Sequence, residues 1–263
     1  MTAVNSNDDL RRGAHILAEL EFGLARIGDE LHGSAPVTPE MFVPETSCLR
    51  TSVLATWADT ASGYAVMGVF APRVPVTLDL DVHVYAPLRD LETISAVARL
   101  LKAGRSVAMV TVEFSSGGER VALATASFMA APNPAVTMPP ELADPSTRPR
   151  PSGRLRMPLA ERARCEIREP GVAVLPRTDD GLNASNTLNG GLIALAIEEA
   201  ALSVTPGATL ASMAMRYLRP VRVGPAIASA EVRAGLGSVE VRDAGSDDRL
   251  AVYAVTKTFA SSQ

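Results

Sequence analysis

Cysteine, lysine and histidine are scarce in this chain of 263 residues. The two cysteines, Cys48 and Cys165, are too few for a disulfide framework, and free thiols fit a reducing compartment. Lys102 and Lys257 are the only lysines, and the net charge of -4 offers no basic footprint for nucleic acid. The three histidines have no metal-ligand spacing. We therefore predict no metal site and no nucleic-acid partner.

Long hydrophobic runs are also missing. No apolar stretch is long enough to cross a bilayer, and charged residues at positions 8, 9, 11 and 12 stand where an export signal would need an apolar run. We expect a cytoplasmic protein without a membrane partner. The hydrophobic fraction of 47% is ample for a buried core in one large domain or two ordinary ones.

The most informative stretch runs from Asn183 to Leu202. It begins as a polar turn and passes through Gly190 and Gly191 into an apolar segment, which predicts a helix buried nearly all round. A buried helix that opens on two glycines presents unshielded N–H groups at its positive end, where an oxygen with negative charge can bind. The same glycines can instead serve the close packing of the helix on a strand.

A second copy of this pattern lies upstream. Residues 49–61 align without a gap on residues 188–200, so that Arg50 falls on Asn189 and Asp59 on Glu198. The similarity continues after each helix: residues 75–87 correspond to 209–220, and residues 120–127 to 249–256. Segments that recur in one order indicate an internal duplication.

Hydrophobic periodicity divides the chain into four regions. We predict an N-terminal amphipathic helix in residues 1–33, centred on the leucine-rich stripe at 8–31, and a first repeat at 34–131. A proline-rich linker at 132–160 separates it from a second repeat at 161–263. Each repeat has a strand, a long helix and then an antiparallel meander; the predicted strands are 76–84, 93–101, 106–114 and 120–129, and then 172–175 and segments from 209, 226, 238 and 249.

These residues resemble a known family. Its signature is an Asn, a His-Gly-Gly six positions later and an acid nine after the His; here Asn183, Asn189, Gly190, Gly191 and Glu198 occupy those positions. Residues 55–61, Ala-Thr-Trp-Ala-Asp-Thr-Ala, match the family's helix. The family is the hotdog-fold acyl-CoA thioesterases of the phenylacetic-acid type. The resemblance implies an α+β double hotdog, with two central helices wrapped by one continuous antiparallel sheet, in a homo-oligomer of such chains.

The two copies retain different parts of the signature. The first keeps the acid, Asp59, and a hydroxyl, Thr77, but has Arg50-Thr-Ser in place of His-Gly-Gly. The second keeps Asn183 and both glycines, with Asn189 in place of His and Leu210 in place of the hydroxyl. Because the family builds each site across two units, the resemblance implies one composite site. The other pseudo-site, with Arg50 facing Glu198, is expected to be degenerate.

The implied chemistry is hydrolysis of acyl-CoA or acyl-carrier thioesters, with no cofactor beyond the coenzyme A of the substrate. The Gly190 N–H would bind the developing oxyanion. Asp59 would act as general base or as nucleophile, and Thr77 would orient water. Asn183 would shape the glycine turn or contact the thioester.

Further substrate contacts are expected from Asn189, Gly191 and Arg105, the last at a hairpin turn that could meet CoA phosphates. Glu198 and Glu199 are expected to be structural, because buried acids are usually paired. An alternative function remains open, a catalytically silent protein that binds acyl thioesters or acts as a scaffold.

Overall fold

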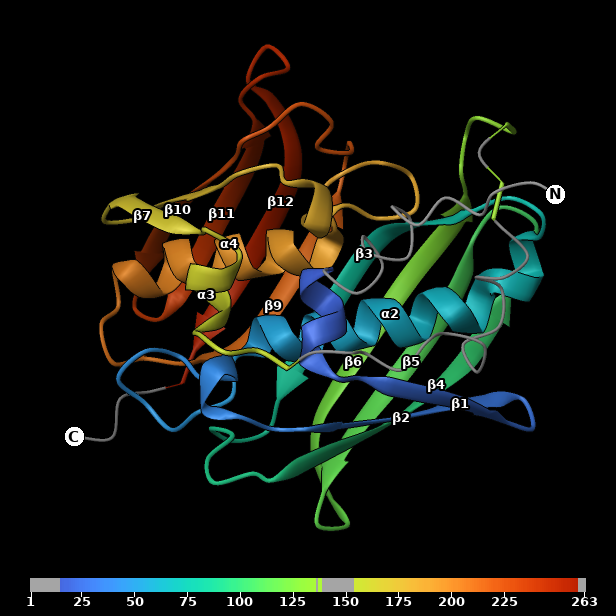
Figure 1. The fold of residues 1–263 in the computed structure, drawn as a ribbon, viewed down its shortest axis with the longest axis horizontal. Coiled ribbons are helices and arrows are strands. Elements are labelled where there is room, and N and C mark those ends of the chain that lie inside the picture. Colours follow the sequence, from blue (N-terminus) through green and yellow to red (C-terminus); the bar gives the residue numbers. More distant parts are fainter. Residues whose placement is uncertain (1–14, 136, 139–153, 260–263) are drawn as a thin grey trace, which may run out of the picture.

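A computed structural model describes residues 15–135, 137–138 and 154–259. Its strands form one twelve-stranded antiparallel sheet in the order β1-β2-β4-β5-β6-β3-β9-β12-β11-β10-β8-β7 (Figure 1). The strands of the first half are β1 (Gly23–Ile27), β2 (Glu30–Pro36), β3 (Pro75–Val84), β4 (Thr93–Ala103), β5 (Ala108–Ser116) and β6 (Glu119–Ala130). Those of the second half are β7 (Glu166–Glu169), β8 (Val172–Leu175), β9 (Leu210–Tyr217), β10 (Ala226–Arg233), β11 (Leu236–Asp243) and β12 (Arg249–Thr258).

The two halves of the sheet join at its centre, where β3 pairs with β9 from Asp79–Arg216 to His83–Ser212. The remaining strands follow outward on each side in equivalent order. This arrangement confirms the predicted duplication and the double hotdog with one continuous sheet.

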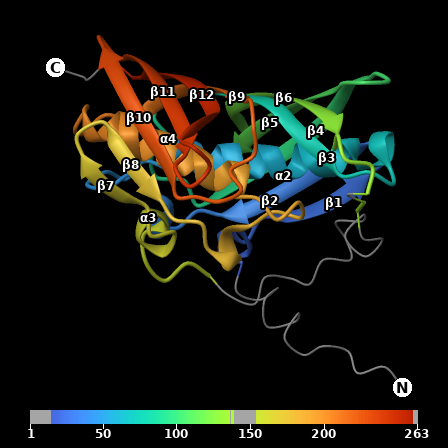
Figure 2. The same cartoon turned by 90° about the horizontal axis from the view of Figure 1, so that it is seen from above.

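Two long helices, α2 (Thr51–Phe70) and α4 (Gly190–Ser203), lie on one face of the sheet, and its outer strands curl around them (Figure 2). Both helices are apolar on nearly every side, and most of their residues are buried. Inward-facing residues of the strands, such as Leu80 and Val82 of β3, complete the core because side chains alternate along a strand. The start of α4 packs against the middle of α2, and the start of α2 packs against the middle of α4.

The predicted N-terminal helix is wrong over its described part. Residues 16–20 form a short 3-10 helix, and β1 and β2 form a hairpin that belongs to the first repeat. The reversal occurs at Gly28-Asp29, where Gly28 has a φ of 60°, because a two-residue hairpin turn needs positive φ. Leu20 and Leu31 are buried as the leucine stripe suggested, but in different elements. Residues 8–14 of the prediction lie outside the described residues.

Most of the predicted linker, 132–160, also lies outside the described residues; its last two positions open the short helix α3 (Leu159–Arg162). Arg162 of this helix forms ion pairs with Glu19 (2.6 Å) and Asp180 (2.8 Å), which tie the beginnings of the two repeats together. Among the described helices, none is long and apolar enough to span a membrane.

Candidate active site

Asp59 lies near the middle of α2, partly buried beside the first strand that follows the helix. Thr77 of β3 donates a hydrogen bond from Oγ1 to Asp59 Oδ1 at 2.7 Å. Burial raises the pKa of Asp59 above its ordinary value, and the Thr77 bond only partly opposes this. Among the described residues no cation forms an ion pair with Asp59. A carboxylate that is desolvated and lacks a countercharge is a stronger base than an exposed one, as a general base requires.

Gly190 and Gly191 open α4 directly against this part of α2. A Cβ built on Gly190 would lie 3.4 Å from Asp59 Oδ2 and 3.0 Å from Tyr217 Oη. The amide nitrogen lies about 2.5 Å from the Cβ position, so Asp59 Oδ2 is within about 6 Å of the Gly190 nitrogen. The Gly190 N–H donates to no partner among the described residues. The structure thus brings the carboxylate of one repeat to an available amide of the other.

Gly191 plays a different part from its neighbour. A Cβ at this position would lie 2.3 Å from Thr56 Oγ1 and 2.8 Å from Thr56 Cβ, so only glycine allows α4 to approach α2 this closely. Its N–H donates to Asn189 Oδ1 at 2.7 Å and is therefore engaged within the protein. The close-packing role considered for the glycines holds for Gly191, with a helix rather than a strand as the neighbour.

The two asparagines shape the entry to α4. Asn183 Oδ1 accepts hydrogen bonds from Ser185 N (2.9 Å), Thr187 N (3.2 Å) and Thr187 Oγ1 (3.1 Å), which closes the loop before the helix. Asn189 is the N-cap of α4. With its Oδ1 on the Gly191 N–H, its Nδ2 group donates to none of the described residues and can face a ligand.

Arg105 lies away from this centre. It is exposed in the turn between β4 and β5 and has no ion-pair partner in the described part of the chain. Ala108, at the start of β5, pairs with Phe128 of β6, which in turn pairs with Thr77. The hairpin therefore lies at the end of the sheet that carries Thr77, two strands away.

The pseudo-equivalent site is closed by its own carboxylate. Glu198 is fully buried and accepts hydrogen bonds from Thr51 N (2.8 Å) and Ser52 Oγ (2.6 Å) at the start of α2. Arg50 Nη1 lies 3.4 Å from Glu198 and 2.5 Å from Glu199. The two glutamates are thus paired, as expected from the sequence. Glu198 fills the helix end that corresponds to the open end at Gly190.

Tyr217, which the sequence reasoning did not select, borders the site. Residues Met213, Met215 and Tyr217 alternate along β9 and face inward, and the Tyr217 hydroxyl reaches Gly190 O at 3.3 Å. Its pKa is well above the usual 10 because of burial first and the Asp59 charge second. The alternation of β9 in the sequence was the signal that could have indicated it.

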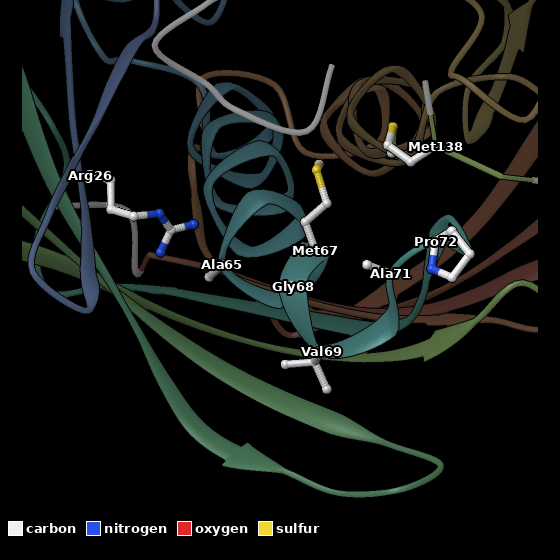
Figure 3. Close-up of a pocket in the computed structure, with 8 residues that line it drawn as sticks. All are labelled: Arg26, Ala65, Met67, Gly68, Val69, Ala71, Pro72 and Met138. Carbon is white, nitrogen blue, oxygen red and sulfur yellow. The ribbon is translucent and has the colours of Figure 1, made fainter. Parts of the chain in front are cut away.

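A pocket of about 550 Å³ lies at the other end of α2. Figure 3 shows it between Arg26 of β1 on one side and Met67, Pro72 and Met138 on the other. Ala65, the lining residue nearest to Asp59 in sequence, lies six positions further along the helix, or roughly 9 Å at 1.5 Å per residue. Neither Asp59 nor Gly190 lines this pocket.

The fold places this protein among the double hotdog proteins, and its candidate site has a carboxylate that faces a helix N-terminus. Residues 51–123 match the family model of the thioesterase superfamily. No curated protein matches the chain by sequence. The family-model match and the fold confirm the resemblance to the hotdog-fold thioesterases, and they support thioester hydrolysis as the kind of activity.

Solved structures share the fold over almost the whole chain. A 12:0-ACP thioesterase from Umbellularia californica has a TM-score of 0.63 and 12% identity, covering 89% of this chain and 99% of that chain. A tesB protein from Mycobacterium avium subs paratuberculosis has a TM-score of 0.60 and 16% identity, covering 93% and 98%. An acyl-ACP thioesterase from Bacteroides thetaiotaomicron has a TM-score of 0.60 and 12% identity, covering 88% and 98%. At these identities the similarity shows the fold alone.

Proposed function

We propose that the chain hydrolyses acyl-CoA or acyl-carrier thioesters at one composite site between its repeats. The observation that carries this proposal is the placement of the Asp59 carboxylate beside the unoccupied N–H of Gly190. The first group can generate or act as a nucleophile, and the second can stabilise the oxyanion that forms on attack. Both are needed for acyl transfer to water, and each repeat supplies only one.

In the general-base route, Asp59 takes a proton from water as the water oxygen attacks the thioester carbon. Thr77, by donating to Oδ1, leaves Oδ2 as the oxygen nearer to Gly190. The carbonyl oxygen gains negative charge and accepts from the Gly190 N–H, a donor of the kind worth about 3 to 4 kcal/mol. Collapse of the tetrahedral intermediate breaks the carbon–sulfur bond and releases a thiolate and an acid.

In the nucleophilic route, Asp59 Oδ2 attacks the same carbon and forms a mixed anhydride, which water then hydrolyses. A single turnover in ¹⁸O-water tests for an anhydride that water opens at the Asp59 carbonyl. The general-base route puts one ¹⁸O into the first product molecule. Attack of water on the Asp59 carbonyl of an anhydride instead leaves that product unlabelled and the ¹⁸O in Asp59.

Asn189 would donate from Nδ2 to the bound thioester while it caps α4. Asn183 would act through the loop it closes, and Gly191 through the helix contact that positions Gly190. With Asn189 at the histidine position of the signature, no histidine is assigned to protonate the departing thiolate. A thiolate is a good leaving group, so hydrolysis does not depend on such an acid.

Arg105 would contact the phosphates of coenzyme A, since it is an exposed cation at the correct end of the sheet. Arg105→Ala should raise KM for acyl-CoA and leave KM for the matching acyl-pantetheine, which lacks those phosphates, unchanged. Arg120→Ala removes an exposed arginine at the opposite hairpin and serves as the control. Equal effects on both substrates would exclude this role.

Assembly through the outer face of the sheet would produce the expected homo-oligomer. That face exposes apolar side chains, among them Tyr253 and Val255 of β12 and Leu101 of β4. Native mass spectrometry of the full chain tests this prediction.

The decisive experiment for the function is thiol release from a panel of short, aryl and medium-chain acyl-CoAs. The parent should release thiol, and Asp59→Asn should reduce kcat/KM by at least about a thousandfold, the scale for losing a nucleophile or its base. Asp79→Asn, a neighbouring acid on β3, provides a matched control. Equal rates for the parent and Asp59→Asn would remove Asp59 from the mechanism.

A further inference from the structure

The phenol of Tyr217 is a poorly satisfied hydrogen-bond donor at the candidate site. Its partners are Gly190 O at 3.3 Å and Met215 Sδ at 3.6 Å. An O–H···O bond usually measures about 2.7 to 2.8 Å, and thioether sulfur is a weak acceptor. A buried tyrosine hydroxyl normally has a good partner. An oxygen with negative charge near Gly190 would be a better acceptor than either.

The position of the hydroxyl fits such an oxygen. Tyr217 Oη lies 3.0 Å from the point where a Gly190 Cβ would stand, and Asp59 Oδ2 lies 3.4 Å from the same point. Since the Gly190 nitrogen is about 2.5 Å from that point, it lies within about 5.5 Å of Tyr217 Oη. One oxygen atom can therefore accept from both the amide and the phenol at normal hydrogen-bond lengths.

The duplication supplies an internal comparison. β3 and β9 each carry a β-bulge, at Leu78 and at Ala211, which fixes the structural alignment of the two strands. With the bulges superposed, Thr77 corresponds to Leu210 and Tyr217 to Val84. Both hydroxyls therefore belong to the site with the available amide. The twin site, which Glu198 closes, has apolar side chains at both positions.

We propose that Tyr217 is a further catalytic residue, whose hydroxyl donates to the thioester carbonyl oxygen together with the Gly190 N–H. The hydroxyl keeps its proton throughout, so no bond is made or broken on Tyr217. Burial and the Asp59 charge hold its pKa well above 10, so the donor form persists across the working pH range. This inference rests on the proposed hydrolysis at Asp59 and Gly190 and adds the second donor.

Tyr217→Phe removes the hydroxyl and keeps the ring. We expect kcat/KM to fall by about a hundredfold to a thousandfold, the scale for loss of one oxyanion donor, with KM changed by less than about threefold. Tyr253→Phe, on the neighbouring strand β12, should match the parent. If Tyr217→Phe stays within twofold of the parent while Asp59→Asn is inactive, the Tyr217 role is wrong and the hydrolytic function stands.

A spectroscopic test does not depend on turnover. An acyl-CoA analogue with a ¹³C ketone in place of the thioester is bound, and its carbonyl stretch is recorded. The parent should lower this frequency relative to water, and Tyr217→Phe should reverse part of the shift. Equal frequencies in the two proteins, or no binding of the ketone, would overturn the proposal. Absence of hydrolysis by the parent, with the shift present, would instead refute the proposed function alone.

Discussion

One added methyl group at each of the two adjacent glycines of α4 should have different effects: at Gly191 it should lower stability, and at Gly190 it should lower activity. Gly191→Ala places a Cβ within 2.9 Å of three atoms of Thr56, all close to the α2 backbone and unable to swing away. Overpacking of this kind costs typically about 1 to 3 kcal/mol. Alanine is favoured over glycine in a helix by up to about 1 kcal/mol, which offsets part of the cost. We expect a net loss of stability of roughly 1 to 2 kcal/mol.

Gly190→Ala should mainly affect catalysis. The nearest atom to its Cβ would be Tyr217 Oη at 3.0 Å, followed by Tyr217 Cζ at 3.3 Å and Asp59 Oδ2 at 3.4 Å. Side-chain ends can yield by a few tenths of an ångström, so the stability change should stay below about 1 kcal/mol. The methyl group would nevertheless occupy the space between carboxylate, phenol and amide. A displacement of a reacting group by about 1 Å can cost a hundredfold in rate.

The assay measures thermal unfolding and kcat/KM for both variants in the same preparations. One kcal/mol corresponds to roughly 2 to 4 °C in Tm for a chain of this size. Gly191→Ala should therefore lose several degrees, and Thr56→Gly should restore part of the loss by removing the opposing atoms. Gly190→Ala should keep its Tm and lose about a hundredfold in kcat/KM. Full activity in Gly190→Ala would refute the placement of the reaction over this residue.

Three further outcomes follow from the charges and hydroxyls. The pKa of Asp59 is raised on folding, so ionisation of Asp59 costs stability as pH rises from about 3.8 through the folded pKa. Asp59→Asn should therefore raise Tm at pH values above the folded pKa and have no such effect near pH 3.8. Thr77→Val removes the bond that lowers this pKa, so the acidic limb of the pH profile of kcat/KM should move to higher pH; an unmoved limb would mean that another group titrates there. Glu198→Gln should lower the free energy of unfolding, measured in urea, by about 3 kcal/mol. This value is in the lower part of the range for breaking a buried pair, because Glu199 still faces Arg50. Unchanged stability would contradict a structural role for Glu198.

Much of this fold could be predicted because its signals are local or repeated. Alternation predicted β3 to β6 within a few residues at each end, and the apolar run after Gly190 predicted α4. The N-terminal hairpin was not predicted because Leu20, Leu24 and Leu31 have helical spacing. In the structure these residues lie in separate elements, and the Gly28-Asp29 turn separates Leu24 from Leu31. A pattern of apolar positions does not distinguish one helix from two short strands when a turn interrupts it.

Only the part of the site that the two repeats share as a motif could be predicted from the sequence. Alignment of the repeats placed Asp59 opposite Glu198 in sequence, and only the resemblance, in which each site spans two units, implied that Asp59 faces Gly190. The structure brings these two residues together. Tyr217 contributes through its position along β9 relative to a helix of the same repeat, which depends on how the sheet curves. The contact of Gly191 with Thr56 likewise depends on how closely two helices cross. Neither distance is encoded in a local pattern.

A comparison of the two aligned acids explains why only one site remains available. Glu198 has one methylene more than Asp59, and its carboxylate reaches the start of the opposite helix, where Thr51 N, Ser52 Oγ and Arg50 meet it. Burial raises the pKa of Glu198, and these partners only partly oppose that shift. The amide of Thr51 and the hydroxyl of Ser52 are both engaged by Glu198, so neither is left for a substrate oxygen. Within the described part of the chain, Asp59 has one hydroxyl partner, and the Gly190 amide opposite it has none. The start of α2 thus has a carboxylate on its N–H and hydroxyl donors, whereas the start of α4 keeps the Gly190 N–H available for a ligand.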